Sequence, residues 1–283
     1  MSIRPFDLTS YNSYRLRASA AVGLVPESSD ELLEALRQYP EAILLGSGHN
    51  IILSRNEYES AFICVTKERA GQIRVANDTI TAYAGVGMKD LSLVALEHRL
   101  SGLEVFYDIP SSLGGATVMN AGASGEQLAS LIVNVIAYDR ETGLVREYSV
   151  DELEYGYRTS IFQRCPQLVV IEASIRLVPG NPVFIRTKME NIKRQRWEKQ
   201  PRDLPNAGSV FRRPPGYYVG AMMDELSLRG LRVGGAEVSR KHSGFIVNTG
   251  GATGADILEL IELIVEKVHN HFGVRLVREQ IVV

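Results

Sequence analysis

Cysteine is scarce in this sequence, with only two among 283 residues, and a disulfide scaffold would need more. Cys64 stands in the apolar run 61–65, and Cys165 stands between Arg164 and Pro166. These surroundings have nothing in common that suggests a bridge or a metal site. We therefore expect two free thiols, which is typical of a reducing compartment and predicts a cytoplasmic protein.

A large net charge and a long apolar run are also missing. Because 31 basic residues face 33 acidic ones, no overall field would attract nucleic acid or an anionic membrane. No window is apolar for long enough to span a bilayer, and residues 1–16 lack the apolar core of a signal peptide. We expect a soluble protein with no nucleic-acid partner, no membrane insertion and no bound metal.

The glycine fingerprint of a dinucleotide-binding βαβ unit is the third absence. No G-x-G-x-x-G run follows a predicted strand and opens a helix with an acid about twenty residues further on. Apolar alternation instead predicts hairpins, one from strands 73–75 and 80–83 and another from strands 132–138 and 144–148, with a further strand at 168–177. We infer a mixed α+β fold and exclude a Rossmann fold.

Helices are predicted at four places. Ser28 and Glu31 have capping-box spacing before one short helix, and Gly87 leads into another that we expect Gly102 to end. A charged helix follows Pro182, and Thr253 can cap a long amphipathic helix that ends at Gly273. The inward face of that last helix is predicted to carry Ile257, Leu260, Ile261, Ile264 and Val268.

The length of the chain and a run of prolines and glycine suggest the domain organisation. A chain of 283 residues can form two or three domains. The sequence Pro-Gly-Asn-Pro at 179–182 is its clearest break. We predict a first domain over 1–180, made of lobes at about 1–67 and 68–180, and a second domain over 181–283.

What the sequence does contain is a glycine-rich stretch from Gly102 to Gly125, which holds five glycines and a proline among apolar residues. Glycine allows a backbone to approach a ligand closely and to form a nest of N–H groups for an anion. A second glycine loop, GSGHN at 46–50, lies upstream. The alternative for each loop alone is an ordinary turn between strands.

Taken together, these loops and three further segments resemble the UDP-N-acetylenolpyruvoylglucosamine reductases, and the resemblance covers essentially the whole chain. It implies an enzyme that uses NADPH and FAD to reduce UDP-N-acetylglucosamine enolpyruvate to UDP-N-acetylmuramate for peptidoglycan. It also implies the two-lobed FAD-binding fold of the vanillyl-alcohol-oxidase type (PCMH type), followed by an α+β substrate-binding domain. The second loop reads IPSSLGGATVMNAGASG (109–125), and the three further segments are YGYRTSIF (155–162), NAGSVFRRP (206–214) and the stretch from GGAEVS (234–239) to HSGFIVN (242–248).

The resemblance assigns three catalytic residues. Ser209 matches the family's proton donor, and Arg158 matches its active-site arginine, whose guanidinium can bind a carboxylate or enolate. Glu279 matches the family's C-terminal acid. Without the family motif, Ser209 would be a turn residue, Arg158 a surface cation and Glu279 an acid in a frayed tail.

The resemblance also assigns binding residues. Noncovalent FAD would be held by the two glycine loops, and the UDP-sugar by cations and an aromatic ring that we expect to pack beside them. The predicted FAD residues are Gly46, Ser47, Gly48, His49, Asn50, Pro110, Ser111, Ser112, Gly114, Gly115, Asn120 and Gly122. The predicted substrate residues are Tyr157, Lys199 and Arg213.

Three departures from the family pattern leave other functions open. The stretch Arg17-Ala18-Ser19 lacks the Gly-Gly pair that the family usually has there, His49 replaces a common serine, and Ile281 stands where many members have a basic residue. The alternatives are a flavin-dependent oxidase of the same fold and a degenerate paralogue that binds the nucleotide sugar without turnover. The chain matches the family's shorter type, without the long tyrosine-bearing loop, and we expect a monomer or a weak dimer.

Overall fold

The computed structural model describes residues 5–66 and 73–283. They form two compact units, each assembled from segments far apart in the sequence. The first unit contains the chain up to Val22 together with Gly48–Ser60 and Trp197–Val283, and the second contains Gly23–Ser47 and Ala61–Arg196. None of the helices in the described ranges combines the length and apolar character needed to cross a membrane.

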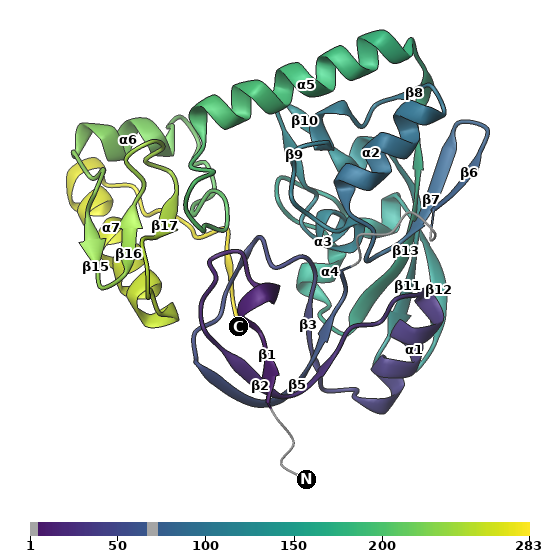
Figure 1. Ribbon diagram of the computed structural model, residues 1–283, viewed down its shortest axis with the longest axis horizontal. Coiled ribbons are helices and arrows are strands. Elements are labelled where there is room, and N and C mark those ends of the chain that lie inside the picture. The colour runs from purple at the N-terminus through teal and green to yellow at the C-terminus, as the bar shows by residue number, and fades with distance from the viewer. Residues whose placement is uncertain (1–4, 67–72) are drawn as a thin grey trace. The chain divides into compact units, whose positions relative to one another are not determined.

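The second unit is built on a five-stranded antiparallel sheet in the order β12-β11-β13-β7-β6. Figure 1 shows its β6–β7 hairpin at the right of the molecule. Both predicted hairpins are confirmed, because β6 pairs with β7 and β11 pairs with β12. The central strands bury small and β-branched side chains such as Val135, Ala173 and Ile175 in the core. The strands are β6 (Ile73–Ala76), β7 (Thr79–Tyr83), β11 (Ile132–Asp139), β12 (Val145–Ser149) and β13 (Leu168–Arg176).

Helices α1 and α3 pack against strand β13 of this sheet. Helix α1 begins as predicted, because the Ser28 hydroxyl accepts a hydrogen bond from the Glu31 N–H at 3.2 Å. The prediction that Gly102 ends helix α2 is wrong, since α2 stops at Glu97 and the chain turns at Arg99, whose φ is +57°. The helices are α1 (Ser29–Gln38), α2 (Met88–Glu97), α3 (Leu113–Val118) and α4 (Ile161–Arg164).

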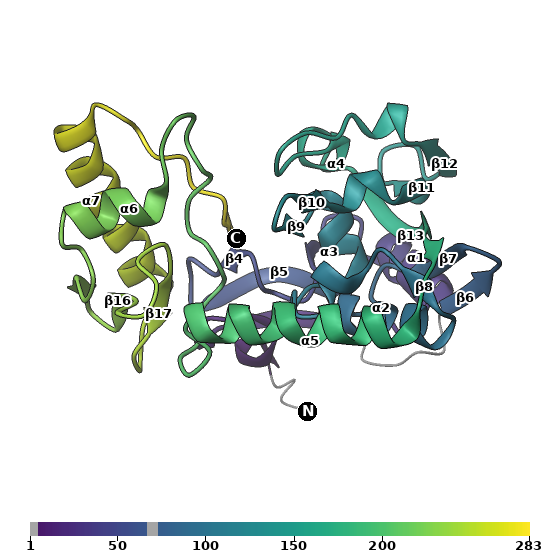
Figure 2. The ribbon, with the colours of Figure 1, turned by 90° about the horizontal axis from the view of Figure 1, so that it is seen from above.

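Helix α5 (Pro182–Lys199) begins at the predicted break but remains in the second unit as far as Arg196. Its buried residues Ile185 and Met189 form a small core cluster with Leu96 of α2, and Figure 2 shows the two helices running alongside each other. This packing explains why the compact unit extends to Arg196, beyond the Pro-Gly-Asn-Pro break at 179–182. The functional division near residue 180 stays a prediction.

The first unit contains a three-stranded antiparallel sheet, β15-β16-β17, covered by helix α7. The predicted ends of α7 are confirmed, with a capping box between Thr253 and Asp256 and with Gly273 in the left-handed region at φ +68°. The five residues predicted to point inward are all buried. The elements are α6 (Val219–Glu225), β15 (Arg232–Val233), β16 (Ala236–Val238), β17 (Ile246–Asn248) and α7 (Gly254–Phe272).

The carboxyl terminus is part of this unit and is not a frayed tail. Strand β18 (Ile281–Val282) runs parallel to β4 (Ile51–Ile52), directly after the first glycine loop. Ile281 pairs with Ile51 there. The remaining elements of the two units are β1 (Phe6–Asp7), η1 (Thr9–Tyr11), β2 (Ser19–Leu24), β3 (Ile43–Leu45), β5 (Glu57–Cys64), β8 (Leu100–Ser101), η3 (Glu104–Phe106), β9 (Gly122–Ala123), β10 (Glu126–Gln127), η4 (Leu128–Ser130), η5 (Asp151–Leu153) and β14 (Val178–Pro179).

Candidate active site

The two predicted glycine loops meet inside the second unit. The Ser47 hydroxyl donates a hydrogen bond to the Pro110 carbonyl at 3.2 Å. A Cβ placed on Gly46 would lie 2.9 Å from Ser112 Oγ and 3.7 Å from Gly115 Cα. Residues that are 63 to 69 positions apart in the sequence therefore share one narrow space that a side chain on Gly46 would fill.

Local structure around α3 explains the serines and glycines of the second loop. Ser112 caps α3 by accepting from the Gly115 N–H at 3.3 Å. A Cβ on Gly114 would lie 2.9 Å from Ala84 Cβ, so Gly114 allows α3 to pack closely on the end of the sheet. Gly46 and Gly115, in contrast, keep the backbone accessible where the loops meet. This backbone-rich cradle fits the pyrophosphate of FAD.

Two buried hydroxyls in the second unit also fit a polar cofactor. Thr117 of α3 is fully buried, and neither its hydroxyl nor that of Tyr155 has a hydrogen-bond partner within the described part of the chain. Burial raises the pKa of Tyr155, so its phenol is a protonated donor at neutral pH. Buried polar atoms usually have partners, and cofactor atoms are one way to supply them.

Asn120 organises the region between the second loop and the predicted catalytic arginine. Its side chain is buried, donates to the Gly156 carbonyl at 2.9 Å and accepts from the Ala129 N–H at 3.0 Å. Its own main chain has a φ of +44°, a conformation that asparagine tolerates better than most residues. Asn120 therefore has a structural role that the sequence did not indicate, besides its predicted place at FAD.

Arg158 is fixed to the same segment. Its guanidinium donates to the Asn120 carbonyl at 3.2 Å and to the Gly122 carbonyl at 2.6 Å. The guanidinium carbon also lies 5.3 Å from the centre of the Tyr157 ring, and Tyr157 itself is exposed. Asn120, Gly122 and Arg158, each predicted separately as a site residue, are therefore in direct contact in the structure.

Two residues that sequence reasoning missed hold this arginine segment in place. The Ser160 hydroxyl donates to the Val118 carbonyl at 2.7 Å, and the Gln163 amide donates to the same carbonyl at 3.1 Å and to the Arg158 carbonyl at 3.0 Å. The S-x-x-Q spacing at the start of α4 is that of a capping box, but Ser160 makes no side-chain cap bond, so this spacing did not indicate the contacts with Val118.

The remaining half of the first glycine loop belongs to the first unit. Gly48 has a φ of +71°, and a Cβ there would lie 2.1 Å from the Tyr11 carbonyl oxygen, so no side chain is possible. The Asn50 amide donates to the Glu279 carbonyl at 3.3 Å, and the Ile281 N–H donates to the Asn50 carbonyl at 2.9 Å. The loop is therefore attached to the C-terminal segment that carries the predicted catalytic acid.

Ser209 and Glu279 lie on neighbouring paired segments. The Glu279 N–H donates to the Val210 carbonyl at 2.8 Å, and Val210 in turn donates to the Gly244 carbonyl at 3.0 Å. Ser209 is exposed, and its hydroxyl has no hydrogen bond to any residue that the structure describes. Its oxygen is thus accessible to a substrate, while backbone hydrogen bonds hold the next residue, Val210, through both its N–H and its carbonyl.

The predicted substrate residues are on the surface. Lys199 is the exposed last residue of α5. Arg213 is also exposed, donates from Nε to the Tyr217 carbonyl at 3.2 Å, and has its guanidinium carbon 3.7 Å from the centre of the Tyr218 ring. Both belong to the first unit, whereas Tyr157 belongs to the second. Stacking on Tyr218 was not foreseen from the sequence.

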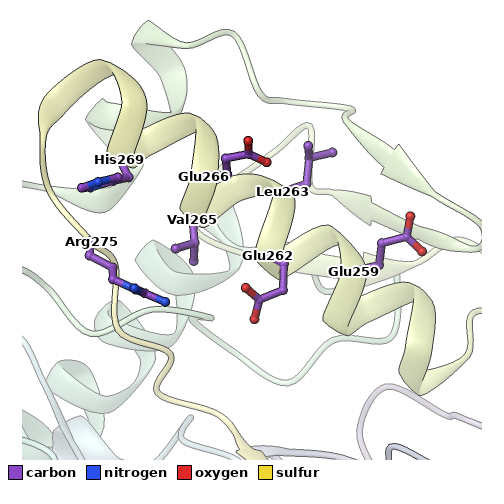
Figure 3. A pocket seen from close by; sticks show the side chains of 7 residues that line it. All are labelled: Glu259, Glu262, Leu263, Val265, Glu266, His269 and Arg275. Carbon is purple, nitrogen blue, oxygen red and sulfur yellow. The ribbon is translucent and has the colours of Figure 1, made fainter.

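A hollow of about 430 Å³ on the outer face of α7 contains none of these residues. Figure 3 shows three carboxylates along its lining helix, and acids are unsuited to binding a diphosphate. Chemistry therefore favours the glycine loops over this hollow as the candidate site. Its lining consists of Glu259, Glu262, Leu263, Val265, Glu266, His269 and Arg275.

Comparisons with known proteins agree with this geometry. Residues 20–146 match an FAD binding domain, and residues 200–283 match the C-terminal domain of UDP-N-acetylenolpyruvoylglucosamine reductase. The reductase of Francisella tularensis is 35% identical over 277 residues, which is 98% of each chain. That of Caldanaerobacter subterraneus is 39% identical over 273 residues, covering 95% of this chain and 89% of the relative.

A solved structure supports the same assignment. The crystal structure of the reductase from Thermus caldophilus superposes with a TM-score of 0.82 at 30% identity, covering 100% of this chain and 99% of the other. The fold and the two joined loops define a flavoprotein with an FAD-binding domain. With relatives matching over nearly its whole length, the chain belongs to the UDP-N-acetylenolpyruvoylglucosamine reductase family.

Proposed function

We propose that this protein reduces UDP-N-acetylglucosamine enolpyruvate to UDP-N-acetylmuramate, with NADPH as reductant and FAD as cofactor, in peptidoglycan precursor synthesis. The observation that carries the proposal is the meeting of Gly46 and Ser47 with Pro110 and Ser112 in a chain whose relatives are reductases of this kind. The similarity to these reductases also supports a nucleotide sugar as the substrate.

The residues that would hold FAD come from both glycine loops. The backbone near Gly46 and Gly115 would lie against the pyrophosphate, because no side chain intervenes there. The Gly114 N–H donates to the Ala84 carbonyl at 2.8 Å, so Gly114 would contribute by its close packing on the sheet. The hydroxyls of Ser47 and Ser111 donate to the carbonyls of Pro110 and Ser112, and they would turn from these carbonyls to donate to FAD. Gly48 and Asn50 would complete the first loop. Held there, FAD would supply the hydride chemistry that links NADPH to the β carbon of the enolpyruvyl group.

Ser209 would supply the proton at the α carbon. Its exposed hydroxyl can approach a substrate, and the backbone pairing of Val210 holds it in one place. A free hydroxyl is a weak acid at neutral pH, so its efficiency depends on positioning and on a neighbouring charge or water.

Arg158 and Glu279 would act on the charge that develops as hydride arrives. Negative charge spreads into the substrate carboxyl group at that moment, and a guanidinium oriented by two carbonyls can stabilise it more than the ground state. Glu279 would assist as a donor or by orienting one. Lys199 and Arg213 would neutralise the diphosphate, with Tyr157 contributing ring contacts.

Two-stage anaerobic kinetics test the proposal. The holoenzyme is reduced with NADPH and then mixed with either UDP-N-acetylglucosamine enolpyruvate or oxygen, while the flavin absorbance is followed. We expect fast reoxidation by the enolpyruvyl sugar and slow reoxidation by oxygen. Fast reaction with oxygen alone would show an oxidase, and no reoxidation by a sugar that binds would show a degenerate binding protein.

The proposal also includes the cellular compartment of the protein and its oligomeric state. The two free cysteines fit the reducing cytoplasm, where NADPH is available. A monomer or weak dimer fits a chain whose proposed catalytic groups are all its own. Sedimentation velocity over a range of concentrations measures the association directly.

A further inference from the structure

A buried hydrogen-bond network in the first unit joins residues near the two ends of the chain. Tyr14 is 0% exposed and Gln280 is 2% exposed. The Tyr14 hydroxyl donates to Gln280 Oε1 at 3.0 Å, and Gln280 Nε2 donates to the carbonyls of Ala207 at 3.1 Å and Gly208 at 3.4 Å. One amide thus satisfies three partners from two distant segments.

The chemistry of these partners fixes the direction of every bond. The carbonyls of Ala207 and Gly208 can only accept, so they must face the NH₂ group of Gln280. Its oxygen then faces Tyr14, whose hydroxyl must donate. Burial raises the pKa of Tyr14, which keeps that hydroxyl protonated. The orientation of the Gln280 amide is therefore determined by the network itself.

The network acts on the backbone at the two predicted catalytic residues. Gly208, which directly precedes Ser209, has a φ of +78°, and its N–H donates to Asn206 Oδ1 at 3.1 Å. Gln280 directly follows Glu279, whose N–H donates to the Val210 carbonyl. The turn before Ser209 is thus held by Asn206 on its N–H side and by Gln280 on its carbonyl side.

We propose that Gln280, oriented by Tyr14, is a positioning residue that fixes the Ala207–Gly208 turn and so sets where Ser209 presents its hydroxyl. The inference rests on the proposed role of Ser209 as proton donor. A proton donor displaced by about 1 Å can lose roughly 10²-fold in rate, so a buried amide that never touches substrate can control the second half-reaction.

Variants of both residues test this role in the holoenzyme. In Gln280→Leu both carbonyls lose their donor, and in the isosteric Gln280→Glu at least one of them does, because a carboxyl group carries at most one proton. We expect reoxidation by the enolpyruvyl sugar to slow by about 10²-fold in Gln280→Leu and by less in Gln280→Glu. Substrate Kd and the rate of reduction by NADPH should stay within about threefold of the wild type, since binding and hydride uptake do not need Ser209. Tyr14→Phe leaves the two carbonyl bonds intact and should slow reoxidation by less than about tenfold.

A double variant separates positioning from stability. Tyr14→Phe combined with Gln280→Leu removes both the hydroxyl and its acceptor, so its melting temperature should exceed that of Gln280→Leu alone. Its reoxidation should remain as slow as in Gln280→Leu, because the carbonyls of Ala207 and Gly208 still lack a donor. Thr253→Ala, which weakens the cap of α7, is the stability control and should leave reoxidation unchanged.

Each outcome decides a separate claim. Wild-type reoxidation in Gln280→Leu, or reoxidation that recovers in parallel with melting temperature in the double variant, would overturn the positioning role. Ser209→Ala is measured alongside. If Ser209→Ala reoxidises at the wild-type rate, the proposed function of Ser209 fails, whatever Gln280 does. If only Ser209→Ala is slow, Ser209 keeps its role and the inference about Gln280 fails.

Discussion

Gly46 and Ser112 lie so close that a Cβ on Gly46 would be 2.9 Å from the Ser112 hydroxyl oxygen. Ser112 cannot move without cost, because the same oxygen caps α3 through the Gly115 N–H. The contact joins the two glycine loops through atoms that leave no room for a larger residue. It is the most specific structural support for an FAD cradle at this place.

Gly46→Ala is therefore expected to weaken FAD binding. The added methyl group must displace Ser112 or separate the loops, and we expect the Kd for FAD to rise at least about tenfold, which is ~1.4 kcal/mol. Flavin content after purification and titration of the apoprotein with FAD measure the change. Gly220→Ala is the matched control, because a Cβ there meets only Ser243 Oγ at 3.6 Å. Equal affinity in Gly46→Ala and the wild type would exclude this cradle.

Arg158→Lys is expected to slow the second half-reaction by about 10²-fold to 10³-fold. A lysine keeps the charge but cannot donate to the carbonyls of Asn120 and Gly122 from one planar group. Stopped-flow reoxidation by the enolpyruvyl sugar gives the rate. Arg164→Lys is the control, since Arg164 pairs with Glu154 at the surface. Comparable slowing in both variants would point to a general effect of losing an arginine.

Glu279→Gln should keep substrate affinity within about tenfold, or ~1.4 kcal/mol, while slowing reoxidation far more. The substitution leaves the main-chain bonds to Val210 and Asn50 in place, so the C-terminal segment should stay docked. Substrate titration of the oxidised protein gives the affinity, and single-turnover reoxidation gives the rate. Glu259→Gln changes an exposed acid on α7 and serves as control. A wild-type rate in Glu279→Gln would leave this acid without a catalytic role.

Asp256→Asn tests the electrostatics of the α7 cap as a function of pH. Hydrogen bonds from the Thr253 and Gly235 N–H groups lower the pKa of Asp256 below its ordinary value of 3.8. A lowered folded-state pKa means that the carboxylate stabilises the fold above the unfolded value and loses this effect as pH falls through the folded value. The variant should be less stable by ~0.5 kcal/mol at pH 7, from the charge at the helix N-terminus.

Urea unfolding at several pH values measures this difference. The stabilities of Asp256→Asn and the wild type should converge as the pH is lowered below 3.8, where the wild-type carboxylate also becomes neutral. A difference that stays constant from pH 7 to pH 3 would mean that hydrogen-bond geometry, and not charge, carries the effect of Asp256.

Elements with a strong local signal could be predicted from the sequence. Helix α7 has its cap at Thr253, its stop at Gly273 and its apolar face where the pattern places them, because these features depend on neighbouring residues. The end of α2 could not be read in this way. Gly102 has a φ of +135°, yet the helix has already ended and strand β8 intervenes, since pairing of β8 with β14 overrides the local signal.

The candidate site likewise combines residues that the sequence indicates with contacts that it does not. Family motifs predict site roles for Arg158, Ser209 and Glu279, but no local pattern could indicate that Tyr14 and Gln280 meet inside the first unit, since 266 positions separate them. The pairing of β18 with β4 could not be predicted either, because a strand as short as β18 has no distinctive sequence pattern. Contacts of this range are set by tertiary packing and not by propensity.

The most direct test of the central claim is a stopped-flow comparison of the two half-reactions in Ser209→Ala. Reduction of the bound flavin by NADPH should proceed at nearly the wild-type rate, because it requires no proton at the substrate. Reoxidation by UDP-N-acetylglucosamine enolpyruvate should slow by about 10²-fold to 10⁴-fold, the usual contribution of a positioned acid. Wild-type reoxidation, or equal slowing of both halves, would contradict Ser209 as the proton donor.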